Sequence, residues 1–134
     1  IPTIIRSMKT EKRIIGDIGE VATCKFLEKK GFAIRERNYL KPCGEIDIIV
    51  QKENVVHFIE VKTLKVDFDF VTHETIYRPE ENVHEGKLKK IARTIQMYLL
   101  EHEEVHDWQF DVVSVLMDQE ARKMRIRFLE DIVL

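Results

Sequence analysis

The chain of 134 residues carries 22 Lys and Arg against 24 Asp and Glu, a formal net charge of −2, and 44% of its residues are hydrophobic. This length fits one domain with a single core, and the composition is that of a folded globular protein. No apolar run approaches the roughly 20 residues that a membrane span needs, so no membrane partner is expected. The near-neutral total disfavours a strongly basic nucleic-acid-binding protein, although basic residues gather locally in RSMKTEKR and KLKKIAR.

The two cysteines, Cys24 and Cys43, are too few for a disulfide framework, and no Cys and His spacing is typical of a zinc site. A reducing, cytoplasmic setting is therefore expected, since the first residues also lack the pattern of a secretory signal. Residues 1–11 are expected to form an amino-terminal extension, and residues 12–134 a single domain.

Apolar residues at three- and four-residue spacing predict an amphipathic helix over residues 12–30, with Ile15, Ile18, Ala22 and Phe26 on its buried face. The remaining elements follow in order: strands over residues 32–40, 45–52 and 55–63, a long loop over 64–86, a helix over 86–103, and strands over 108–117 and 124–129. Strands and helices in this order indicate a mixed α/β sheet flanked by helices. The long loop is expected to be mobile and to serve function, because loops of this length without structure of their own are uncommon.

The stretch GEIDIIVQKENVVHFIEVK places an acid in each of two apolar strands, Asp47 in the first and Glu60 in the second. If the strands turn through two residues, Asp47 lies opposite Glu60, and Glu45 lies opposite Lys62. All four side chains then share one face of the hairpin, because successive side chains of a strand alternate between faces. This register, set by a two-residue turn, is favoured because it leaves the opposite face of the hairpin apolar.

Two facing carboxylates repel each other, which raises the pKa of one of them unless a cation lies between them. Oxygen ligands without Cys or His favour a hard ion such as Mg²⁺ or Mn²⁺. Lys62 could then stabilise charge on a phosphate or orient a water. A third acid could come from Glu20, because the neighbouring Gly19 would let its helix approach the sheet. From the pattern alone, a solvated cluster of salt bridges is an equal alternative.

An Asp, about a dozen residues, then Glu-x-Lys on a hairpin after an acidic helix resembles the PD-(D/E)XK nuclease superfamily. Over residues 16–116 the chain resembles the YraN family of predicted endonucleases, related to Holliday-junction resolvases. The matching segments are GDIGEVATCKFLEKKGF, RERN, GEIDIIV, HFIEVKT, KLKKIARTIQMYL and WQFDVVSV. Ile46 replaces the usual proline, and the 64–86 loop is longer than the family's connection. The resemblance implies a restriction-endonuclease-like fold.

By this resemblance, Asp47 and Glu60 would be catalytic residues and metal ligands for Mg²⁺ or Mn²⁺, and Lys62 the catalytic lysine. Glu20 would be the helix acid and a further metal ligand, and Glu45 an additional residue of the site. The polar positions expected to touch the phosphate backbone are Arg37, Asn38 and Lys87.

The basic run that begins at Lys87 continues through Lys89, Lys90 and Arg93. The pattern alone indicates a helix face exposed to solvent. The functional interpretation is that these side chains bind the phosphates of a nucleic-acid backbone.

The expected function is therefore a metal-dependent endonuclease that hydrolyses phosphodiester bonds in nucleic acid, DNA more than RNA, with branched DNA as a candidate substrate. The alternative is a nucleic-acid-binding module that keeps the nuclease fold without turnover, and a third hypothesis gives the long loop a protein-binding role. Resolvase-like relatives suggest a homodimer, although no apolar stripe identifies an interface.

Overall fold

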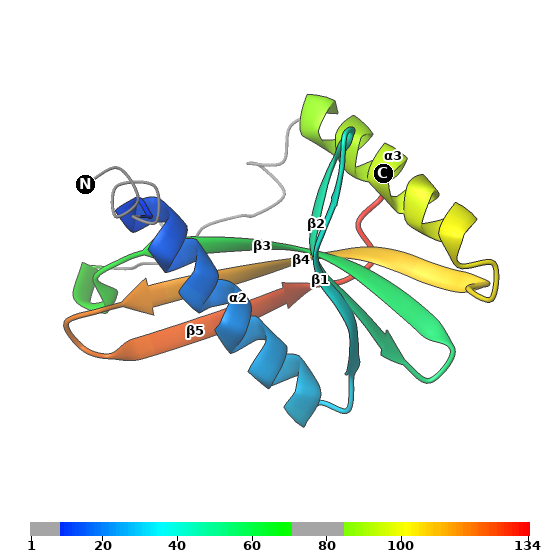
Figure 1. Cartoon of the computed structure of the whole chain (residues 1–134). Coiled ribbons are helices and arrows are strands. Elements are labelled where there is room, and N and C mark those ends of the chain that lie inside the picture. The colour runs from blue at the N-terminus through cyan, green and yellow to red at the C-terminus, as the bar shows by residue number, and fades with distance from the viewer. Residues whose placement is uncertain (1–8, 71–84) are drawn as a thin grey trace, which may run out of the picture.

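The computed structural model describes residues 9–70 and 85–134, which form a five-stranded mixed sheet with two flanking helices (Figure 1). The elements are α2 (Glu11–Lys29), β1 (Ala33–Lys41), β2 (Gly44–Lys52), β3 (Val55–Lys65), the 3-10 helix η1 (Phe68–Phe70), α3 (Glu85–Glu101), β4 (Asp107–Asp118) and β5 (Lys123–Leu129). The predicted α/β class is confirmed, and no helix or strand boundary differs from its prediction by more than two residues. Most of the predicted loop, residues 71–84, lies outside the described residues.

The sheet has the strand order β1-β2-β3-β4-β5, and every neighbouring pair is antiparallel except β3 and β4, which are parallel. The hairpin between β2 and β3 has the predicted register, because Lys52 pairs with Val55 and Ile48 with Ile59. Its two-residue turn places Glu53 at a φ of 56°, in the left-handed region. The predicted two-residue turn and its register are therefore confirmed as far as Ile48 and Ile59, but the pairing does not continue to Asp47 with Glu60 or to Glu45 with Lys62.

Two hydrophobic cores lie on the two faces of the sheet. The core under α2 includes Leu27, Ile59 and Val113, and the core under α3 includes Phe58, Ile95 and Tyr98. Within β3 these residues alternate between the faces, as the strand period requires.

The predicted buried face of α2 is partly wrong, because Ile18 is 40% exposed. The helix instead buries Ile15, Gly19, Thr23 and Leu27. Gly19 faces Thr63 of β3, and Ile18, about 100° further round the helix, therefore lies at the edge of the buried face.

β2 leaves β3 before either strand ends. Their pairing stops at Ile48 and Ile59, and the β1–β2 hairpin then rises from the sheet toward α3 (Figure 1). Ile46 therefore packs with the core under α3, whereas strict alternation had placed it on the face of Ile48. This divergence opens a fork between the two strands.

Across the described ranges, no helix is long and apolar enough to cross a membrane.

Candidate functional site

A cleft of about 260 Å³ lies at this fork, where the start of β2, the middle of β3, the first turn of α2 and the start of α3 meet. It is lined by Arg13, Gly44, Glu45, Asp47, Glu60, Lys87, Lys90 and Ile91. Gly44 lets α3 pack closely on β2, since a Cβ there would lie 2.9 Å from Oγ1 of Thr94. Three of the predicted acids thus line one cavity.

Asp47 is partly buried, and one carboxylate oxygen accepts a 2.8 Å hydrogen bond from the backbone N–H of Val61. Burial, followed by repulsion from Glu60, raises the pKa of Asp47 to about 8 from an ordinary 3.8. Glu20 and Glu45 add to this rise, and the Val61 hydrogen bond opposes it. The side chain therefore lies in a field of negative charge that its nearby cations do not cancel.

Glu60 is 7% exposed, and its carboxylate lies 2.8 Å from the ammonium of Lys87. Lys62 follows Glu60 by two residues on β3, so the two side chains lie on the same face of the strand. Burial, followed by repulsion from Lys87, lowers the pKa of Lys62. Among the described residues, Lys62 makes no ion pair, so the predicted alternative of a Glu45–Lys62 salt bridge is not found. Lys62 is half-buried and is not among the residues that line the cleft, so its contact with a ligand there stays a prediction.

Glu20 reaches the site from α2 because Gly19 packs against β3. A Cβ at Gly19 would lie 1.8 Å from Oγ1 of Thr63, so the close approach predicted for this glycine is confirmed. The Glu20 carboxylate is buried and lies 3.8 Å from the guanidinium of Arg37. Burial raises the pKa of Glu20, and the arginines nearby oppose the rise.

Asn38 connects two of the acids. With its amide nitrogen turned toward them, it lies 3.1 Å from Oε1 of Glu45 and 3.1 Å from Oε1 of Glu20. Asn38 and Arg37, predicted to touch phosphate, thus hold carboxylates of the cluster in this structure. Their contact with a nucleic acid stays a prediction.

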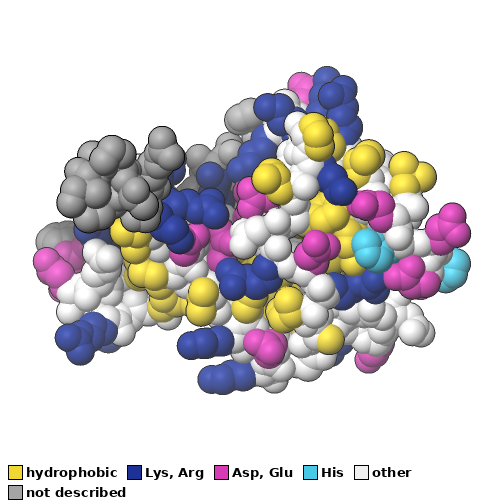
Figure 2. Space-filling model, in the orientation of Figure 1, with side chains coloured by type: hydrophobic (Ala, Val, Ile, Leu, Met, Phe, Trp, Pro, Cys, Tyr) yellow, Lys and Arg dark blue, Asp and Glu magenta, His cyan; other side chains and the backbone are white. Residues whose placement is uncertain are grey.

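The basic residues predicted at α3 divide into two groups. Lys87 and Lys90 line the cleft, whereas Lys89 pairs with Glu85 at 3.5 Å and Arg93 is exposed. Figure 2 shows dark blue Lys and Arg side chains over the beginning of α3 and around the magenta acids between α3 and α2. The acids therefore lie within a basic rim, although the net charge of the chain is negative.

No three Asp, Glu, His or Cys side chains in residues 9–70 and 85–134 lie close enough together to hold a metal ion. Asp47 and Glu60 nevertheless supply carboxylate oxygens to one cleft, where burial, then the charge of Glu60, raises the pKa of Asp47. Mg²⁺ is commonly held by one or two carboxylates, with water and substrate phosphates completing its shell. The donor set thus fits a hard divalent ion, and Glu20 as a further ligand stays a prediction.

Sequence reasoning missed two features of the chain. Arg13 lines the cleft from the first turn of α2, and only its place in the basic segment RSMKTEKR indicated it. Asp111 had no assigned role, yet it is fully buried and pairs with His57 on the other face of the sheet. The signal for Asp111 was the same as for Asp47: an acid inside an apolar strand.

Comparisons with known proteins place this chain among relatives without an assigned activity. Residues 19–115 match the family described as Uncharacterised protein family UPF0102. A UPF0102 protein of Campylobacter jejuni is 40% identical over 103 residues, which are 77% of this chain and 84% of that protein. Another from Campylobacter fetus is 33% identical over 93% of this chain and 98% of its own length, and one from a Sulfurovum species is 35% identical over 95% and 100%.

Proposed function

We propose that this chain, which belongs to the UPF0102 family, is a metal-dependent endonuclease that hydrolyses phosphodiester bonds in nucleic acid. The observation that carries the proposal is the fork of β2 and β3, where Asp47 and Glu60 face each other with lysines beside them. The resemblance to the YraN family of predicted endonucleases supports the same assignment and favours DNA over RNA, including branched DNA.

Asp47 and Glu60 would hold Mg²⁺ or Mn²⁺, with Glu20 as the predicted third acid; the bound ion would activate a water and neutralise charge on the phosphate. Lys62 would bind a phosphate oxygen and stabilise the charge that develops on it. Arg13 and Lys90 would bind the backbone on either side, since both line the cleft.

The test is cleavage of a labelled panel of duplex, single strand, flap, four-way junction and RNA, in Mg²⁺, Mn²⁺ or EDTA. Wild-type protein is expected to cut at least one substrate only with metal, and Asp47→Asn to cut none. Asp107→Asn is the matched control, because this exposed aspartate lies at the start of β4 and outside the cleft. Equal cutting by wild type and Asp47→Asn would exclude the assignment.

A non-catalytic nucleic-acid-binding module is the second candidate, favoured by the ion pair between Lys87 and Glu60. This pair already neutralises one acid without a metal. The module would bind nucleic acid in EDTA with strong salt dependence, and Asp47→Asn would leave that binding unchanged. A homodimer, which would present two clefts to a branched substrate, belongs to the endonuclease proposal and is checked by the molar mass in solution.

A further inference from the structure

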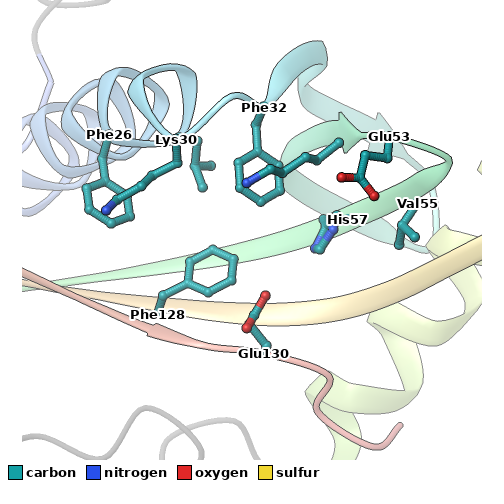
Figure 3. A pocket seen from close by; sticks show the side chains of 10 residues that line it. Phe26, Lys30, Phe32, Glu53, Val55, His57, Phe128 and Glu130 are labelled. Carbon is teal, nitrogen blue, oxygen red and sulfur yellow. The ribbon is translucent and has the colours of Figure 1, made fainter.

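A second and larger cavity, of about 460 Å³, lies on the α2 face of the sheet, away from the acidic cleft. The end of α2, the β2–β3 turn and β5 surround it. Three phenylalanine rings line it: Phe26 from α2, Phe32 from the segment after α2, and Phe128 from β5 (Figure 3). Its walls are therefore apolar and aromatic, and a flat ring would fit against them.

His57 of β3 contributes the polar group of this cavity. Its Nδ1 lies 2.6 Å from the carboxylate of Asp111, and its ring meets Phe32 edge-on at 5.0 Å between centroids. Asp111 is completely buried and also accepts hydrogen bonds from Gln109 and from the backbone N–H of Asp131. Oδ2 of Asp111 faces His57 and Oδ1 accepts the other two hydrogen bonds, so the His57 ring is held in one orientation.

The other ring nitrogen of His57, Nε2, has no partner among the described residues and is not sealed from solvent. Histidine ring nitrogens that are held on one side present the other to a ligand. Nε2 therefore offers a fixed hydrogen-bonding atom at the base of an aromatic cavity.

Charged side chains stand at the rim of the cavity in a defined arrangement. The ammonium of Lys30 lies 5.5 Å from the centre of the Phe26 ring, and that of Lys52 lies 5.2 Å from the centre of the Phe32 ring. Glu53 and Glu130 complete the rim. Lysines suit a phosphate, and carboxylates suit an amino group.

We propose that this cavity binds one unpaired nucleobase of a nucleic-acid strand. The phenylalanines would contact the faces of the base, His57 Nε2 and a rim carboxylate would bind its polar edge, and Lys30 and Lys52 would bind the adjoining phosphates. Aromatic side chains combined with basic groups are the recurring way in which proteins hold single strands. The inference rests on the proposed function, because it assigns the cavity to the strand that the acidic cleft engages.

The two sites lie on opposite faces of the sheet but share the elements β3 and α2. His57 and Glu60 are three residues apart on β3, which corresponds to about 10 Å along the strand. Glu20 and Phe26 are six residues apart on α2, or about 9 Å along the helix axis. A strand that engages both sites would therefore pass around the sheet, and a base held in the cavity would fix the position of that strand relative to the cleft.

The test measures binding by fluorescence anisotropy in EDTA, so that no cleavage is needed. The probe is a labelled duplex with a single-stranded arm, in DNA and RNA versions, compared with copies in which one arm position is abasic. In wild type, one abasic position is expected to weaken binding by roughly tenfold. In Phe128→Leu and His57→Gln the same abasic position is expected to change binding by less than about twofold.

Val55→Phe, which fills the cavity from β3, gives the same readout if the other two variants fail a thermal-unfolding check. Lys25→Ala is the matched control, because Lys25 is exposed on α2 and does not line the cavity. No binding, no position-specific abasic effect in wild type, or an undiminished effect in the variants would each overturn the inference. Loss of the endonuclease assignment alone would leave the anisotropy result standing, so the two failures are distinguishable.

Discussion

The acidic cleft and the aromatic cavity each contain an acid from an apolar strand, but the two acids have opposite surroundings. Asp111 is sealed from solvent, pairs with His57, and accepts hydrogen bonds from Gln109 and the backbone N–H of Asp131, so both of its oxygens have partners. Asp47 accepts one backbone hydrogen bond, from Val61, and lies near the like-charged Glu60, which raises its pKa. Burial alone therefore does not distinguish the two acids; the number and charge of their partners does.

The largest effect is expected from the cleft acids Asp47 and Glu60 and from Lys62. Asp47→Ala, Glu60→Ala and Lys62→Ala should each lower cleavage by more than about 100-fold, because each removes a group that would touch the metal or the phosphate. Single-turnover rates on the preferred substrate measure this. Glu28→Gln, an exposed change elsewhere on α2, should leave the rate unchanged, and activity surviving in all three cleft variants would contradict the assignment.

The two acids should affect stability with opposite signs. Asp111→Ala should lower the free energy of unfolding by about 3 kcal/mol, since it leaves buried donors without an acceptor. Asp47→Asn should raise it by roughly 1 kcal/mol in metal-free buffer at pH 8, because it relieves repulsion. Urea unfolding of both variants beside wild type measures the difference, and equal destabilisation by both would remove the contrast between the two regions.

The pH dependence of stability should follow from Asp47. Its folded pKa of about 8 lies above the ordinary 3.8, so the folded state holds a proton that the unfolded chain releases between these values. Stability should therefore fall as the pH rises from about 4 to 8 in EDTA, by at most about 1.4 kcal/mol per pH unit from this group. The fall should be smaller in Asp47→Asn, as measured by urea unfolding at several pH values. A wild type and a variant with parallel profiles would argue against the raised pKa.

A pair of glycines in α2 tests how the helix positions Glu20. Gly19→Ala should destabilise the fold by about 1–3 kcal/mol, because the new Cβ would meet Thr63. Gly16→Ala, three residues earlier and with nothing within 4 Å of its Cβ, should stabilise by about 0.5–1 kcal/mol. Thermal unfolding of the two variants beside wild type measures whether each change raises or lowers stability. A stabilising Gly19→Ala would show that α2 does not pack against β3 at this residue.

The smallest effect is expected from the lysines of α3. Lys90→Ala should reduce the dependence of log Kd on log salt by about one unit, as loss of one phosphate contact does. Lys89→Ala should change it less, because Lys89 lies outside the cleft and pairs with Glu85. Salt titrations of nucleic-acid binding by the two variants measure these slopes. Identical slopes would show that the cleft does not bind the nucleic-acid backbone.

The sequence by itself determined the elements, the register of the β2–β3 hairpin next to its turn, and the placement of Asp47 and Glu60 at one site. These follow from local rules: side chains alternate along a strand, and a two-residue turn sets which residues face each other. Gly19 likewise indicated where α2 would come close to the sheet.

Only the tertiary structure decided where β2 leaves β3, and therefore that Ile46 joins the core under α3. It also decided that Ile18 is exposed, that Lys87 pairs with Glu60, and that His57 meets Asp111 across 54 positions of sequence. These features depend on contacts between elements far apart in the chain, and no local period of hydrophobicity encodes such contacts.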